Sequence, residues 1–324
     1  MKMKKPNFLN NPGNLVESFF LKINHNDIAT WIKYTFLFSK KLNQKSARIW
    51  FTYFKRNQEP LHIHKTYSIK DIEFNDFSLR ISEHLWDFKN YTITGKLENI
   101  KWNIYYKPIK ETLFLLPFKF LYSNLLPNMK IYTPIPSLIA NGSISIDNQI
   151  IELKNSYGMF GHNWGKKHSY IYVWSHCNKF FNNNNCFFEG FSAKLKVGNF
   201  ITPYINMGIL SINEEIIFFN HLNSIFLSKC YLNNNKFWKF TLKNNQYLLD
   251  GLIEGNDFAY LKYLNPDGHY SICKNTKIAN ITLRLINKSN LKNILLLKSD
   301  IAALEFLYPE TIHEEVIKNE KNFR

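Results

Sequence analysis

Residues 30–38 read TWIKYTFLF and residues 47–54 read ARIWFTYF. In both stretches aromatic and β-branched residues recur with a period of two, which is typical of β-strands and not of helices. The same period continues in three further stretches, LHIHKTY (61–67), YTITGKL (91–97) and KWNIYY (101–106). The first third of the chain is therefore predicted to be a run of β-strands.

Turn residues punctuate the later part of the chain at intervals of about ten residues. These signals are Asn233–Asn235, Asn244–Asn245, Gly255–Asn256, Pro266–Gly268 and Asn275–Thr276, and the segments between them, such as 246–253 and 258–263, read as strands. This spacing predicts an antiparallel meander. Helix-like character is limited to Glu111–Leu125, which Pro117 interrupts, and to the charged tail Glu310–Arg324.

A length of 324 residues suits two domains better than one. We expect an all-β chain with few short helices, built from two successive antiparallel units of about eight strands each. The predicted domains are residues 1–165 and residues 166–324, the second ending in a short helix or tail. Each unit is either a sandwich or a barrel, and an eight-stranded barrel is wide enough to enclose one small ligand. The sequence does not distinguish these two architectures.

Composition excludes several classes of protein. The chain is 45% hydrophobic with 12 Gly and 11 Pro, so it is neither disordered nor collagenous. It has no apolar run of membrane-spanning length, and its basic N-terminus precedes no apolar segment, so we predict a cytoplasmic protein. No C-x-x-C pair occurs among the four cysteines, which we expect to be free thiols: Cys177, Cys186, Cys230 and Cys273.

The formal net charge of +16 raises the question of a polyanionic partner. Only five of the 41 basic residues are arginine, the residue that nucleic-acid recognition favours, and the lysines are scattered. We therefore expect no specific nucleic-acid partner. Transient contact with an anionic membrane surface, in a peripheral location, stays open as an alternative.

One segment differs from the rest, GMFGHNWGKKH at 158–168, followed by the strand SYIYVWSHC. Three glycines in eight residues indicate that the backbone bends there or is closely approached. In the following strand one face is aromatic and ends in a histidine, which suits the wall of an apolar cavity. Its residues are Tyr170, Tyr172, Trp174 and His176.

Glu189 is predicted to share a strand face with Phe187 and Phe191. Burial between two phenyl rings would disfavour the charged form of its carboxyl group, which could then donate a proton. The structural alternatives are that Glu189 points to solvent and that the tryptophans and histidines of this region only fill the core. The spacing of His162, His168 and His176 matches no common zinc pattern, and the pair His62 and His64 lacks a third ligand, so no metal and no cofactor are predicted.

The GHNWG sequence at 161–165 resembles the signature of the two-domain lipocalin-like family that includes the carotenoid 1,2-hydratases (hydroxyneurosporene synthases). Tocopherol cyclases and decalin-forming fungal Diels–Alderases are more distant relatives in architecture. Further similarity lies in the two opening strands, in LYSNLLPNMKIYTPIPSLIANGSI and in YVWSHC, so the resemblance covers roughly residues 29–195.

The resemblance implies two lipocalin-like β domains that hold an apolar ligand within or between them, and non-redox chemistry on an isoprenoid- or polyene-like substrate. Hydratases carry an acid where this chain has Gly161, which puts hydratase activity in question. If the protein is an enzyme, it is a hydratase- or cyclase-type lyase or isomerase, with His162 and Glu189 as catalytic residues. The predicted ligand-binding residues are Asn163, Trp164, His168, Tyr170, Tyr172, Trp174 and His176.

Two other functions remain open. A non-catalytic carrier would use the same cavity, and it explains the missing acid directly. A polyanion binder would instead lose affinity steeply as salt rises. The segment Leu113–Pro136 is either a lid that takes up ligand from an anionic bilayer or a short helix that closes one barrel end. The sequence does not indicate an oligomeric state.

Overall fold

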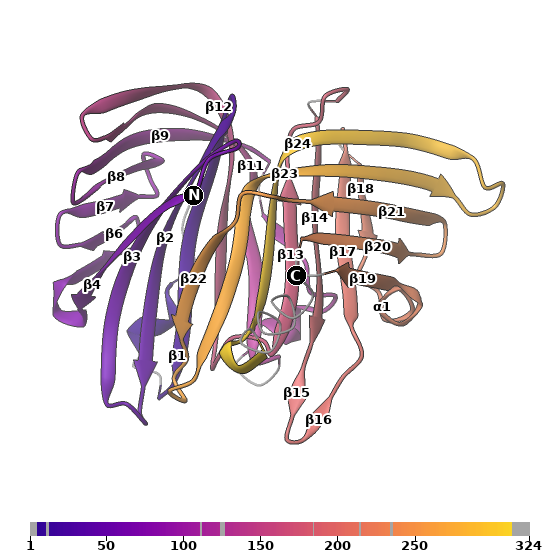
Figure 1. Ribbon diagram of the computed structural model, residues 1–324. Helices are drawn as coiled ribbons and strands as arrows, with labels where there is room; N and C mark the ends of the chain where they lie inside the picture. The colour runs from indigo at the N-terminus through magenta and orange to yellow at the C-terminus, as the bar shows by residue number, and fades with distance from the viewer. Residues whose placement is uncertain are drawn as a thin grey trace, which may run out of the picture.

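The computed structural model describes residues 5–10, 13–110, 112–123, 127–183, 185–213, 215–233 and 236–312. Two large antiparallel sheets stand side by side, one a nearly closed barrel and the other a half-barrel (Figure 1). The predicted all-β class with two barrel-like domains is thereby confirmed. Within these ranges no helix is both long enough and apolar enough to cross a bilayer.

The first sheet has the strand order β4-β3-β2-β1-β12-β11-β9-β8-β7-β6-β5, with β10 paired to β11. Most neighbours are consecutive hairpins, and Asn26, Asn43 and Asn57 supply the left-handed backbone that tight turns need. The strands are β1 (Leu15–His25), β2 (Ile28–Ser39), β3 (Gln44–Lys55), β4 (Leu61–Ser68), β5 (Ile72–Asn75), β6 (Ser78–Ile81), β7 (His84–Asp87), β8 (Thr92–Leu97), β9 (Ile100–Lys110), β10 (Leu113–Phe114), β11 (Met129–Ile146) and β12 (Gln149–Gly165).

The second sheet has the order β18-β17-β14-β13-β24-β23-β21-β20-β19, with β22 paired to β23 and a separate hairpin β15–β16. Its strands are β13 (Ile171–Cys177), β14 (Cys186–Lys194), β15 (Lys196–Val197), β16 (Phe200–Ile201), β17 (Ile205–Ile212), β18 (Glu215–Phe219), β19 (Lys229–Asn233), β20 (Phe237–Lys243), β21 (Tyr247–Glu254), β22 (Ala259–Leu264), β23 (Tyr270–Asn287) and β24 (Asn293–Pro309). The strands of the first sheet thus end at Gly165 and those of the second begin at Ile171.

In the described part of the chain, helical structure is confined to residues 310–312 and to the short pieces η1 (Asn7–Asn10), η2 (Ile69–Asp71), η3 (Lys119–Tyr122) and α1 (Leu222–Leu227). The helix expected over 111–125 is wrong in its described part, which holds β10 and one 3₁₀ turn. Pro117 lies between them and has no N–H to continue a helix. The expected tail helix lies mostly outside the described residues, which end at Ile312.

Among the residues that the structure describes, three buried clusters form the core. One fills the first barrel and a second fills the half-barrel. The third joins side chains of β1, β2 and β12 to side chains of β13, β14, β23 and β24, so it lies between the sheets. Strand alternation produces this arrangement, because successive side chains of β2 point in turn to the first barrel (Ile32, Tyr34) and to the junction (Trp31).

Candidate functional site

The signature residues lie within β12, which is a continuous strand paired with β1 on one side and β11 on the other. Of the two explanations offered for the glycines of 158–168, a backbone bend is therefore wrong as far as Gly165. The glycines instead allow neighbouring backbone to approach β12 closely. A Cβ at Gly158 would lie 2.6 Å from the Lys22 carbonyl oxygen, and one at Gly165 would lie 1.8 Å from that of Asn128.

Alternation along β12 separates the signature into two faces. Trp164 belongs to the core of the first barrel, and the ring of His162 stacks on it with centroids 4.7 Å apart. Asn163 points the other way and lines a cavity at the junction of the sheets. Gly161 shares that side, because a Cβ there would lie 2.2 Å from Cζ of Phe20, which also lines the cavity.

His162 is held inside the first barrel. Its Nε2 lies 2.9 Å from Oε1 of Glu17, and its ring stacks on Phe19 with centroids 4.2 Å apart. Glu17 also accepts hydrogen bonds from the backbone N–H groups of Asn7 and Phe8, at 3.0 and 2.9 Å. This buried pair therefore fastens the N-terminal segment to β12. The predicted catalytic role of His162 remains a prediction, on a side chain that does not line the cavity.

The cavity between the sheets has a volume of about 90 Å³, room for a few water molecules. An adjoining hollow of about 390 Å³ shares Pro127, Met129, Ser169 and Leu195 with it. Together they reach the roughly 300–1,000 Å³ that small-molecule sites occupy. Aromatic rings from both sheets form much of the inner wall: Phe20, Trp31, Tyr172, Trp174 and Phe191.

Three charged side chains stand at this apolar wall. Lys33 and Glu305 line the cavity, and Glu305 Oε1 is 2.6 Å from Nζ of Lys277, which is fully buried. Lys277 Nζ also lies 4.5 Å from the ring centroid of Trp31. Burial lowers the pKa of Lys33 to about 8, although nearby Glu305 acts in the opposite direction.

Glu189 is buried one layer behind the cavity wall. Its Oε1 accepts hydrogen bonds from Thr133 Oγ1 at 2.9 Å and from the indole N–H of Trp174 at 3.0 Å. No described residue bonds its Oε2. Burial raises the pKa of Glu189 to about 7, although both hydrogen bonds oppose the shift. The expected neutral carboxyl thus has a physical basis, but Glu189 itself does not line the cavity, whereas Trp174, which bonds it, does.

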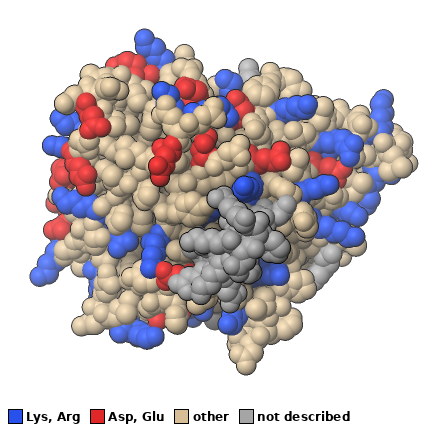
Figure 2. All heavy atoms as spheres, viewed as in Figure 1, with Lys and Arg blue, Asp and Glu red and all other residues tan. Residues whose placement is uncertain are grey.

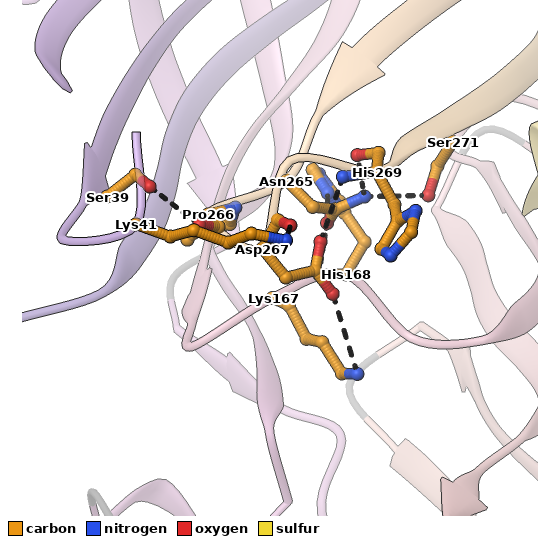
Figure 3. A network of polar contacts seen from close by, with 9 residues as sticks. All are labelled: Ser39, Lys41, Lys167, His168, Asn265, Pro266, Asp267, His269 and Ser271. Carbon is orange, nitrogen blue, oxygen red and sulfur yellow. Dashed lines mark hydrogen bonds and ion pairs between the residues drawn. The ribbon is translucent and has the colours of Figure 1, made fainter. Parts of the chain in front are cut away.

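The remaining predicted ligand residues lie apart from the inner cavity. His168 donates its backbone N–H to Asn265 Oδ1, and its Nδ1 lies 2.8 Å from the same oxygen. Figure 3 shows His168 in a network that ties the loop after β22 to Ser39, at the end of β2. Tyr170 borders the outer hollow, and His176 bonds the Pro136 carbonyl at 2.8 Å.

The segment considered as a lid contributes to both the core and the surface. Leu113, Leu115 and Leu116 are buried, and Leu116 lines the cavity. Phe120 is 67% exposed beside Lys119. Contact of this segment with an anionic bilayer stays a prediction. Figure 2 shows lysine and arginine interspersed with acidic side chains on the visible face, without one continuous stripe.

Sequence reasoning missed the charged group of Lys33, Lys277 and Glu305. A signal was present for Lys33, because it shares the strand face of Trp31 and is the only charged residue of the run at 30–38. The partners come from β23 and β24, more than 240 residues later, so no local pattern joins them. No cluster of three or more His, Cys, Asp or Glu side chains able to hold a metal occurs in the described ranges.

Fold and cavity define a β protein of two barrel-like sheets with an aromatic cavity at their junction. The chain belongs to the tocopherol cyclase-like family, whose model matches residues 124–306. The family resemblance drawn from the GHNWG signature is confirmed. No curated protein matches the sequence significantly.

Solved structures with similar folds cover nearly the whole chain. A candidate AttH from Nitrosomonas europaea is 8% identical with a TM-score of 0.58, over 94% of this chain and 97% of that one. CghA bound to Sch210972 is 9% identical with a TM-score of 0.59, over 91% and 88%. Kievitone hydratase from Nectria haematococca is 11% identical with a TM-score of 0.51, over 92% and 89%. At these identities the likeness concerns the fold.

Proposed function

We propose that the protein catalyses a non-redox conversion, such as hydration, cyclisation or isomerisation, of an apolar isoprenoid- or polyene-like molecule at the junction of its sheets. The observation that carries the proposal is the aromatic cavity on the Asn163 face of the signature strand. Membership of the tocopherol cyclase-like family supports it, as does the similarity in fold to a protein named kievitone hydratase.

The aromatic wall suits chemistry through a carbocation. When an alkene is protonated, its π bond breaks, one carbon gains the proton and the other becomes cationic. Lys33 and Lys277 already contact the ring of Trp31, and Lys277 contacts that of Trp174, so the rings proposed to attract such a charge are the other aromatic ones of the wall, Phe20, Tyr172 and Phe191. Loss of a proton completes an isomerisation, attack by an internal nucleophile closes a ring, and addition of water followed by proton loss gives an alcohol. Each path returns one proton, so no oxidant is needed.

Glu189 is the proposed acid. Its raised pKa of about 7 leaves about half of the molecules protonated at neutral pH. Glu189 does not line the cavity, so transfer requires a rearrangement that brings its carboxyl, which now bonds the Trp174 indole, into contact with the substrate. Asn163 lines the cavity and is proposed to orient a polar group of the substrate. His162 would then act only through its support of β12.

Turnover is tested by solvent labelling. A lipid extract of the native host is incubated with the protein in D₂O, and the products are analysed by mass spectrometry. We expect a product that has gained one carbon-bound deuteron, or that deuteron together with the elements of water. Glu189→Gln is expected to lower its rate by at least about 100-fold, whereas Lys292→Met, on an exposed turn, should not. Full activity of Glu189→Gln would exclude the assigned acid.

A carrier function is favoured by one observation. Position 161, where carotenoid hydratases carry an acid, faces the cavity, but here it is glycine and the ring of Phe20 fills the space. A carrier would release the bound molecule unchanged and unlabelled after incubation in D₂O. Mass spectrometry of molecules that co-purify with the protein therefore separates the two functions.

A further inference from the structure

Lys33 is a buried cation at the wall of the cavity. It lies in the middle of β2, is 4% exposed, and its Nζ lies 4.2 Å from the ring centroid of Tyr263 and 5.0 Å from that of Trp31. Among the described residues it has these ring contacts and no hydrogen bond or ion pair. An ammonium seldom remains buried without an anionic or hydrogen-bonding partner, because desolvation of the charge is costly.

The neighbouring carboxylate is already engaged. Glu305 Oε1 pairs with Lys277 at 2.6 Å, and Lys277 also donates to Asn275 Oδ1 at 3.2 Å. The group thus holds two ammonium ions and one carboxylate, a surplus of one positive charge. Burial raises the pKa of the nearby Cys273 thiol to about 12, so Cys273 does not supply a second negative charge at neutral pH.

The other titratable groups around Lys33 are neutral as well. Burial lowers the pKa of His168 to about 4, and it raises the pKa of Tyr172 and of Tyr263 well above the usual value. With its own pKa of about 8, Lys33 is mostly protonated at pH 7. Its charge therefore remains uncompensated in the protein alone.

We propose that Lys33 binds a singly charged oxygen anion, such as a carboxylate, at the polar end of an otherwise apolar ligand. The anion would complete the charge balance of the cavity, and the apolar body would extend past Pro127 and Leu195 into the adjoining hollow. This inference rests on the proposed function and narrows its substrate class to amphiphiles with one negative charge.

Three probes of equal chain length separate charge from hydrophobic fit: octanoate, octanamide and 1-octanol. Binding is measured at pH 7 from tryptophan fluorescence, since Trp31 and Trp174 line the cavity. For the wild-type protein we expect octanoate to bind at least about tenfold more tightly than octanamide, which corresponds to about 1.4 kcal/mol. Lys33→Met should remove this preference while 1-octanol binds as before.

Lys292→Met is the matched control, because it removes one charge from an exposed position outside the cavity. This control variant should keep the preference for octanoate. That result would exclude a general effect of the +16 net charge on binding. The comparison of octanoate with octanamide on the wild-type protein needs no variant, so the proposal stays testable if Lys33→Met does not fold.

The outcomes separate this inference from the proposed function. Equal binding of octanoate and octanamide by the wild-type protein would overturn the anion subsite and leave the apolar cavity intact. An unchanged preference in Lys33→Met would overturn it as well. If none of the three probes binds, then neither the subsite nor the apolar ligand site of the proposed function stands.

Discussion

The ion pair between Glu305 and Lys277 offers the sharpest test of the charge arrangement at the junction of the sheets. Glu305→Gln preserves the shape of the side chain and removes its charge. Lys277 is fully buried, and Lys33 is 4% exposed. The variant would therefore hold two buried ammonium groups close to the ring of Trp31, and the carboxylate that pairs with one of them would be gone.

The size of the effect follows from the geometry. Two unit charges 2.6 Å apart attract by about 6 kcal/mol at an effective dielectric constant of 20. Part of this attraction offsets desolvation, and breaking a buried pair typically costs about 3–5 kcal/mol. We therefore expect the free energy of unfolding to fall by about 3–5 kcal/mol.

The assay is urea denaturation at pH 7, followed by tryptophan fluorescence. Lys277→Met should be milder than Glu305→Gln, because Glu305 would still face the Lys33 ammonium. The double variant, Glu305→Gln with Lys277→Met, should regain much of the lost stability. It removes both charges of the ion pair, so neither is left without its partner. Glu310→Gln, which breaks the exposed pair with Lys262, is the matched control and should cost less than about 1 kcal/mol.

Two results would refute this reasoning. In the first, the free energy of unfolding of Glu305→Gln lies within about 1 kcal/mol of the wild-type value, and its dependence on urea concentration is unchanged. The other is a double variant as unstable as Glu305→Gln alone. Either result would mean that water or side-chain movement relieves the charge of Lys277 without Glu305.

Three further predictions concern pH, the signature strand and the N-terminal segment. Octanoate binding should weaken up to about tenfold per unit as pH rises above about 8, because Lys33 loses the proton that binds the anion. Burial and Lys277 disfavour that proton, and Glu305 favours it. A fluorescence titration series checks this, and an equal decline in Lys33→Met would contradict it. Gly161→Asp should lower the free energy of unfolding, measured by thermal denaturation, by at least about 1–3 kcal/mol, because the new Cβ would lie 2.2 Å from the Phe20 ring. Adding Phe20→Ala to that variant should recover part of the loss. If the loss in the double variant equals the sum of the losses in the two single variants, the predicted clash is contradicted. Glu17→Gln should lower stability by about 2–4 kcal/mol in urea, because it weakens the bonds that Glu17 accepts from Asn7 and Phe8 and its pairing with His162. An unaltered midpoint would show that this buried pair does not fasten the N-terminal segment.

The sequence by itself determined the strands and the family. A period of two depends only on neighbouring residues, so TWIKYTFLF and ARIWFTYF predicted β2 and β3, and the signature at 161–165 identified the relatives. The same local alternation placed Tyr172 and Trp174 on one face of β13, and both line the cavity. The helix expected around Pro117 was wrong, because apolar content without a clear period does not distinguish a helix from buried irregular chain.

Tertiary structure alone decided which face of each strand meets the ligand cavity. Alternation shows that His162 and Asn163 point in opposite directions, but not which one faces the first barrel and which the junction. That choice depends on how the second sheet packs against β1, β2 and β12. The charge pattern of the cavity also arises only there, because Lys33 meets Lys277 and Glu305 through sheet packing across more than 240 residues of chain.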